Sequence, residues 1–314
     1  MVPFVVAVLS GVVLLGILLA ARRVEASFAP HRVPNRRNPG SLHLPYEDVV
    51  FPTVNRKHLH GWFIRSADEG QAHGENQNRR PTIVVLHGWS RSADAMLGYA
   101  RMLNRAGYHV FLFDARNHGD SDRARHSSLL QYSEDLRAAL DYVSSRADVD
   151  RDRIGLIGHS IGAAATLVVA ATDPRVKAAV SLASFAHPGE LTENALRSRG
   201  IRNRVMVSVI LYYLQMRLGV RFDDIAPERL MSRIHVPVLL FHGDNDDVVP
   251  LEDHFRLVRA KSGKGSVQSK ILHGVNHTAF ESHPEFEPTI LRFLESAFGP
   301  MKPSATVNNN VHHL

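Results

Sequence analysis

The sequence predicts an α/β protein whose mostly parallel eight-stranded sheet carries helices on both faces. Three observations support this fold class. The chain has 314 residues, which is enough for one large domain. From Thr82 onward, short apolar runs alternate with longer helical patterns, as expected when helices connect parallel strands. The first of these runs is apolar and β-branched almost throughout, which is typical of a strand buried on both faces.

Each expected element has a recognisable pattern. The first two strands, Val49–Val54 and His58–Arg65, form a predicted hairpin, because apolar and polar residues alternate in the second. The remaining strands are expected at Thr82–Leu86, His109–Phe113, Arg153–Ile157, Val176–Leu182, Val236–Phe241 and Gln268–Leu272. The helices are expected at Ala93–Arg105, Leu130–Arg146, Ile161–Ala171, Glu252–Lys261 and Glu285–Phe298.

One segment breaks this alternation. Residues 188–235 have helical character and no strand pattern, so we expect a helical cap inserted over one end of the sheet. Within it, Val205–Leu214 is apolar except at Ser208 and is too short to span a bilayer. We expect this helix to form one wall of an acyl pocket through Ile210 and Leu214; the alternative is that it packs as ordinary core.

The N-terminal region predicts membrane attachment. Val2–Ala21 has no charge and is long enough to cross the hydrocarbon layer, which is about 30 Å thick. The domain plan is therefore an anchor at 1–22, a tether at 23–45, a folded domain at 46–299 and a disordered tail at 300–314. A cleaved signal peptide is the alternative, but Arg22 and Arg23 follow the apolar stretch at once. By the positive-inside rule, the domain of this single-pass cell-membrane protein should face the cytoplasm.

Charge and cysteine content exclude several functional classes. The net charge is +6, and residues 1–40 contribute +4 of it. The folded domain therefore lacks the basic excess of a nucleic-acid-binding protein, and no nucleic acid is expected as a partner. The absence of cysteine excludes a disulfide framework, a thiolate metal site and a cysteine nucleophile.

The strongest chemical signal is the sequence G-H-S-I-G at residues 158–162, between an expected strand and an expected helix. A serine on such a turn is pushed out at the edge of the sheet, and the flanking glycines leave room for the turn. Ser160 is therefore the predicted nucleophile. The backbone N–H of Ile161, at the start of the helix, would face the developing oxyanion.

A second oxyanion donor is expected in the loop that follows the strand Thr82–Leu86. That loop reads H-G-W-S at residues 87–90. In hydrolases with this type of serine turn, the second donor comes from this loop. The backbone N–H of Trp89 is the best candidate.

An acid and a base follow in the required chain order of serine, acid and histidine. His277 comes after the last expected strand and would take the Ser160 proton. The acid would orient the imidazole, and by chemistry alone it could be Asp244, Asp246 or Asp247. Three other histidines lie in the motif loops and are expected to pack or hydrogen-bond locally: His87, His159 and His242.

Together these motifs resemble the serine hydrolases of the α/β-hydrolase superfamily, over roughly residues 46–298. Within it, the strings at 44–49 and 61–64 are similar to membrane-anchored bacterial hydrolases. The resemblance implies the α/β-hydrolase fold, Asp246 as the acid and a structural role for the loop Asp114–Ser121. It also implies no metal and no organic cofactor.

The expected activity is hydrolysis of a carboxylic ester or thioester through an acyl-Ser160 intermediate. A serine peptidase, an acyltransferase and a haloperoxidase-like enzyme would use the same groups, and a catalytically silent scaffold is the alternative from another class. The expected partners are a small-molecule ester or acyl substrate and membrane lipid around the N-terminal helix. The sequence specifies neither the substrate's chain length nor the oligomeric state.

Overall fold

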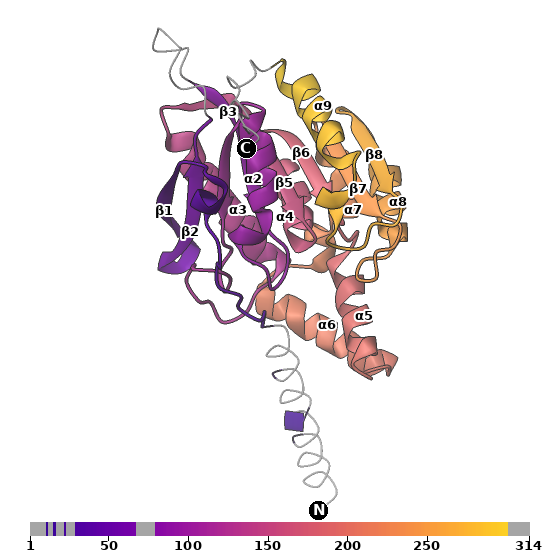
Figure 1. Cartoon of the computed structure of the whole chain (residues 1–314). Helices are drawn as coiled ribbons and strands as arrows, with labels where there is room; N and C mark the ends of the chain where they lie inside the picture. The colour runs from indigo at the N-terminus through magenta and orange to yellow at the C-terminus, as the bar shows by residue number, and fades with distance from the viewer. Residues whose placement is uncertain (1–10, 12–14, 17–21, 23–28, 67–78, 301–314) are drawn as a thin grey trace, which may run out of the picture.

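The computed structural model describes residues 29–66 and 79–300, together with Gly11, Leu15, Gly16 and Arg22 (Figure 1). Its centre is an eight-stranded sheet with the order β1-β2-β4-β3-β5-β6-β7-β8. β2 runs antiparallel to β1 and β4, and every other neighbouring pair is parallel. The strands are β1 Tyr46–Thr53, β2 Lys57–Ile64, β3 Arg80–Leu86, β4 His109–Phe113, β5 Val149–His159, β6 Val176–Leu182, β7 Val238–Gly243 and β8 Val267–Leu272. This confirms the predicted sheet.

Helices cover both faces of the sheet, because alternate residues of each buried strand point to opposite sides. Val84 and Leu86 pack with α3, α4 and α8, whereas Ile83 and Val85 pack with α2 and α9. The helices are α2 Leu97–Arg105, α3 Leu129–Ser145, α4 Ile161–Ala170, α5 Pro188–Ser198, α6 Arg204–Leu218, α7 Pro227–Leu230, α8 Leu251–Ala260 and α9 Phe286–Phe298. The two apolar layers explain why the central strands read as continuous apolar runs.

Within the chain between β6 and β7, α5 and α6 lie beyond one end of the sheet, whereas α7 packs against α4 and α8 (Figure 1). Residues 183–237 are all described and contain no strand; they hold α5, α6 and α7 with short 3-10 turns. α5 and α6 share a small apolar core of Leu196, Val207 and Ile210. We call the segment Pro188–Leu218, which contains α5 and α6, the cap.

Two of the expected regions fall outside the described residues. Val2–Ala21 does so except for Gly11, Leu15 and Gly16, and the expected tail does so from residue 301. Within the described parts of the chain, no helix is long and apolar enough to cross a membrane. The anchor and the tail stay predictions.

Candidate active site

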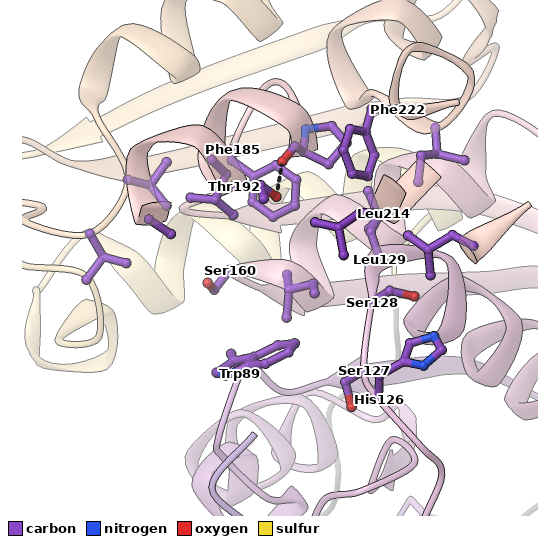
Figure 2. A pocket seen from close by; sticks show the side chains of 18 of the residues that line it. Trp89, His126, Ser127, Ser128, Leu129, Ser160, Phe185, Thr192, Leu214 and Phe222 are labelled. Atoms are coloured by element: carbon purple, nitrogen blue, oxygen red, sulfur yellow. Dashed lines mark hydrogen bonds between the residues drawn. The ribbon is translucent and has the colours of Figure 1, made fainter. Parts of the chain in front are cut away.

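Ser160 occupies the turn between β5 and α4, at the edge where the parallel strands end. Its backbone has φ 56° and ψ −118°, a conformation that costs a non-glycine residue on the order of 1–3 kcal/mol. The fold enforces this conformation, because the Ser160 N–H donates to the Leu182 carbonyl oxygen at 2.8 Å. The Ser160 side chain lines a pocket at this edge (Figure 2).

The glycines on either side of Ser160 permit close backbone contacts. A Cβ atom at Gly158 would lie 2.2 Å from the Gly162 carbonyl oxygen. A Cβ atom at Gly162 would lie 2.5 Å from the His87 carbonyl oxygen. A side chain at either position would push α4 away from the strand ends, so both glycines are needed to hold Ser160 where it is.

Trp89 and Ile161, the predicted oxyanion donors, lie in the two segments that meet at Ser160. The loop after β3 comes so close that a Cβ atom at Gly88 would lie 3.2 Å from Ser160 Cβ. Among the described residues, neither the Trp89 N–H nor the Ile161 N–H donates a hydrogen bond to a protein group. Both donors are therefore available to a ligand oxygen.

His277 and Asp246 are brought together from the loops after β8 and β7. The His277 Nδ1–H donates to Asp246 Oδ2 at 2.8 Å, which leaves Nε2 as the unprotonated nitrogen. Asp246 Oδ1 accepts from the Val248 and Val249 N–H groups, each at 2.9 Å. Burial raises the pKa of the Asp246 carboxyl, but the hydrogen bonds from His277 and the two N–H groups outweigh it and lower the pKa below its usual value.

The other two candidate acids lie elsewhere. Asp244 accepts hydrogen bonds from the His273 ring and from the Gly274 N–H, both at 2.7 Å, at the surface. Asp247 is exposed. Of the three aspartates left open by the chemistry, only Asp246 contacts His277 among the described residues.

His159 holds His277 in place through a hydrogen bond to the His277 backbone. The His159 Nε2–H donates to the His277 carbonyl oxygen at 2.6 Å. Burial, with a smaller effect of nearby His277, lowers the pKa of His159 to about 4, so this ring is neutral at pH 7. Among the described residues, no hydrogen bond joins the Ser160 hydroxyl to His277; such bonds are often long without substrate.

The loop that carries Trp89 is supported by a buried network that the sequence did not reveal. His118 Nε2 accepts from the Ser90 N–H at 3.2 Å, and the Tyr132 hydroxyl, which donates to the Gly88 carbonyl oxygen at 3.3 Å, lies 3.0 Å from the same nitrogen. The His118 Nδ1–H donates to the Arg116 carbonyl oxygen at 2.9 Å. Burial, and next the nearby His87, lower the pKa of His118 to about 3, which keeps it neutral. No sequence pattern pairs these residues, since Ser90 and His118 lie in separate loops and Tyr132 lies in α3.

His87 and His242 are buried and bonded locally, as predicted for the motif histidines. The His87 Nδ1–H donates to the Gly88 carbonyl oxygen at 2.7 Å, and Nε2 accepts from the Ala115 N–H at 3.1 Å. His242 Nε2–H donates to the Val249 carbonyl oxygen at 3.0 Å. His87 therefore joins the loops after β3 and β4, and His242 holds the loop after β7.

The pocket beside Ser160 is a cavity of about 430 Å³, within the usual range for small-molecule sites. Trp89 and Ser160 lie on one side, and Phe185, Leu214 and Phe222 lie across the cavity (Figure 2). Leu214 of α6 therefore lines the pocket as expected. Ile210 does not line it: this residue is buried in the small apolar core between α5 and α6, which corrects its expected place.

Part of the expected tether is bound to the domain. Leu42 and Leu44 pack against the core beside α2 and α9. The reason is polar complementarity with the loops after β3 and β4, which the Pro- and Arg-rich composition did not reveal. The hydrogen bonds are His31 N–H to Ser90 Oγ at 3.0 Å, Arg32 Nε to the Gly119 carbonyl oxygen at 2.8 Å, Asn35 Nδ2 to Asp114 and Asp120 at 2.6 and 2.8 Å, Asp94 N–H to Asn35 Oδ1 at 3.1 Å, and Arg36 N–H to Asp94 at 3.1 Å.

A group of potential metal ligands lies under this segment. Ligand atoms of His60, Asp114 and Asp120 are within 4.8 Å of one another. However, the Asn35 side-chain NH₂ donates to both carboxylates and so fills the space between them. This arrangement fits a hydrogen-bonded loop support rather than a metal centre.

Comparison with known proteins agrees with this geometry. The family described as serine aminopeptidase S33 matches residues 77–225. The protein YfhR of Salmonella typhimurium is 28% identical over 232 residues, which are 71% of this chain and 72% of that protein. The α/β hydrolase domain-containing protein WAV2 of Arabidopsis thaliana is 27% identical over 281 residues, 84% of this chain and 83% of that protein.

The fold also matches solved structures. An esterase of Pyrococcus furiosus, Pf2001, superimposes with a TM-score of 0.69 at 22% identity, covering 86% of this chain and 98% of that one. At this identity the likeness concerns the fold alone. The matched family, these relatives and this fold together support a serine hydrolase of the α/β-hydrolase superfamily.

Proposed function

We propose that the protein is a serine ester hydrolase that works through an acyl-Ser160 intermediate. The observation that carries the proposal is the strained Ser160 turn at an apolar pocket, next to a His277–Asp246 pair joined at 2.8 Å. His277 Nε2 accepts the Ser160 proton as the hydroxyl oxygen attacks the ester carbonyl carbon. The same proton then passes to the departing alcohol or thiol, and water repeats the sequence to release the acid.

The N–H groups of Trp89 and Ile161 stabilise the oxyanion of each tetrahedral intermediate in this proposal. Asp246 keeps His277 in the tautomer that accepts the proton and stabilises the imidazolium. Both roles use groups that need no rearrangement, because the two N–H groups are unpaired and Asp246 is already bonded to His277.

The pocket lining favours an ester or thioester over an aminopeptide. An aminopeptidase must hold a free α-ammonium group, for which carboxylate oxygens are the usual partners. No Asp or Glu lines the pocket among the described residues; its charged groups are Arg199 and Arg217. The mostly apolar lining instead suits the acyl chain of an uncharged ester.

The test combines a covalent probe with a substrate series on the full chain. A fluorophosphonate probe should label the protein and not its Ser160→Ala variant. p-Nitrophenyl esters of increasing chain length should be cleaved, with one acyl thioester for comparison and an aminoacyl p-nitroanilide left intact. Faster cleavage of the anilide would favour the peptidase, transfer of the acyl group to an added alcohol would favour the acyltransferase, and no labelling would favour the silent scaffold.

We also propose that residues 1–22 anchor the protein in the cell membrane, with the catalytic domain on the cytoplasmic side. The uncharged stretch and the arginines that follow it support this orientation. In fractionated cells, alkaline carbonate should leave the full chain in the membrane pellet. Release of the intact chain, or a mature N-terminus near Ser27, would contradict the anchor.

A further inference from the structure

One face of α6 is apolar and exposed. Val205, Tyr212 and Met216 are 73%, 66% and 65% exposed, and their spacing puts them in a single stripe along the helix. The opposite face is the one that holds Ile210 in the cap core and Leu214 in the pocket. Soluble domains rarely expose grouped large apolar side chains without a partner. We therefore expect another surface to cover the stripe.

The chain around this stripe is strongly basic. Residues 194–222 contain six arginines and no aspartate or glutamate, although Arg197 and Arg221 pair with Glu193 and Asp223 just outside this range. Arg202 and Arg204, just before and at the start of α6, form no ion pair within the described residues. A helix with an apolar face and arginine at its ends has the character of helices that lie in the interface of an anionic membrane.

The chain also leads from the predicted anchor to this end of the domain. His31 donates to Ser90, the neighbour of the pocket residue Trp89, and α6 supplies pocket residues on the cap side. Only the eight residues 23–30 separate the predicted anchor from His31. Fully extended, such a linker reaches about 30 Å, so it would hold the pocket end of the domain near the bilayer.

We propose that the stripe Val205–Tyr212–Met216, with Arg202 and Arg204 at the start of α6, forms a docking surface for an anionic phospholipid bilayer. The apolar side chains enter the headgroup boundary, and the arginines meet the lipid phosphates. A second copy of the chain is a poorer partner, because a two-fold contact through this face would set the same arginines against one another. The proposal concerns where the domain sits and does not depend on the reaction at Ser160.

The absence of cysteine allows a direct test with single labels. In the full chain, Tyr212→Cys is labelled with the fluorophore NBD and reconstituted in vesicles of phosphatidylcholine with phosphatidylglycerol. The matched control is Val50→Cys on β1, where the native residue is 69% exposed. Label at 212, and not at 50, should shift its emission to the blue and be quenched by lipids with brominated acyl chains. Equal, water-like emission at both positions would overturn the proposal.

A second experiment tests the contribution of charge with the double variant Arg202→Gln and Arg204→Gln in the Tyr212→Cys background. Each arginine lost should lower the ratio of docked to free label by about fivefold, which corresponds to about 1 kcal/mol per cation near an anionic surface. Arg105→Gln with Arg151→Gln, on exposed positions of the opposite sheet edge, should change nothing. Insensitivity to phosphatidylglycerol, or disulfide dimers of Tyr212→Cys formed without lipid, would contradict the membrane as the partner.

Discussion

The loops at the carboxyl ends of the strands, here called the sheet edge, are held together by different interactions from those that hold the cap. At the sheet edge, buried polar groups tie the loops to one another, as His159 ties β5 to the His277 loop and His118 supports Ser90. The cap has a three-residue apolar core and exposes large apolar side chains to its surroundings. The comparison indicates that the reacting groups sit where buried hydrogen bonds join several loops, whereas the α6 side of the substrate pocket rests on a small apolar core.

The first prediction tests whether catalysis depends on the nucleophile at the sheet edge. Ser160→Ala should lower kcat by about 10⁴-fold or more, measured with a p-nitrophenyl ester, because the nucleophile is lost. Ser160→Gly should be equally inactive yet more stable than Ser160→Ala by about 1 kcal/mol, since glycine tolerates φ 56°. Equal stability of the two variants in urea unfolding would mean that the turn is not strained.

The second prediction separates the aspartates of one loop. Asp246→Asn should lower kcat by about 10⁴-fold, because the amide no longer orients His277 as the carboxylate does. Asp244→Asn is the matched control, and we expect less than about tenfold loss from it because it bonds to His273 instead. A larger loss for Asp244→Asn would transfer the acid role to that residue.

The third prediction concerns the pH dependence of the buried network. Burial lowers the pKa of His118 to about 3 and the pKa values of His109, His159 and His254 to about 4. These rings are neutral in the folded protein and take up protons on unfolding once the pH is below about 6.5. Their contribution to the free energy of unfolding is therefore complete above about pH 6.5 and is lost as the pH falls toward 4. Urea unfolding at a series of pH values checks this; a flat profile down to about pH 4.5 would contradict it.

The fourth prediction compares two neighbouring side chains of α6. Leu214→Ala should reduce kcat/KM for a medium-chain ester by up to about thirtyfold relative to an acetyl ester, from about 2 kcal/mol of lost apolar contact. Ile210→Ala, buried in the cap core, should instead loosen the cap and affect both esters alike. Similar chain-length profiles for the two variants would mean that α6 is not a wall of the acyl site.

The smallest expected effect lies in the bound N-terminal segment. Asn35→Ala should lower the free energy of unfolding by about 1–3 kcal/mol, because Asp114 and Asp120 lose a shared donor.

Chains starting at residue 30 and at residue 46 provide the comparison: the first should match the full chain in stability and activity, and the second should lose both in part. Equal behaviour of the two chains would mean that residues 30–45 are a plain tether, as the sequence predicts, and add nothing to stability or activity.

Much of the sheet edge could be predicted from sequence. The strands read as continuous apolar runs because burial on both faces demands it, and the turn at Ser160 needs glycine at both contacts. These requirements act over a few residues, so they leave a local signal. The choice of Asp246 over Asp244 and Asp247 came from the resemblance, because all three aspartates lie within the same turn.

The contacts of Asn35, His118 and Ile210 become apparent in the folded protein and have no signal in the sequence. Asn35 meets Asp114 across 79 residues of chain, and a hydrogen bond between distant segments leaves no periodic pattern in either. Ile210 and Leu214 look alike in the sequence, and the packing of α6 on α5 alone sends one into the cap core and the other into the pocket. The strands and the serine turn are visible in the sequence, because local backbone geometry and burial prescribe residue types. Tertiary packing decided which polar and apolar partners meet, because that depends on the placement of whole elements.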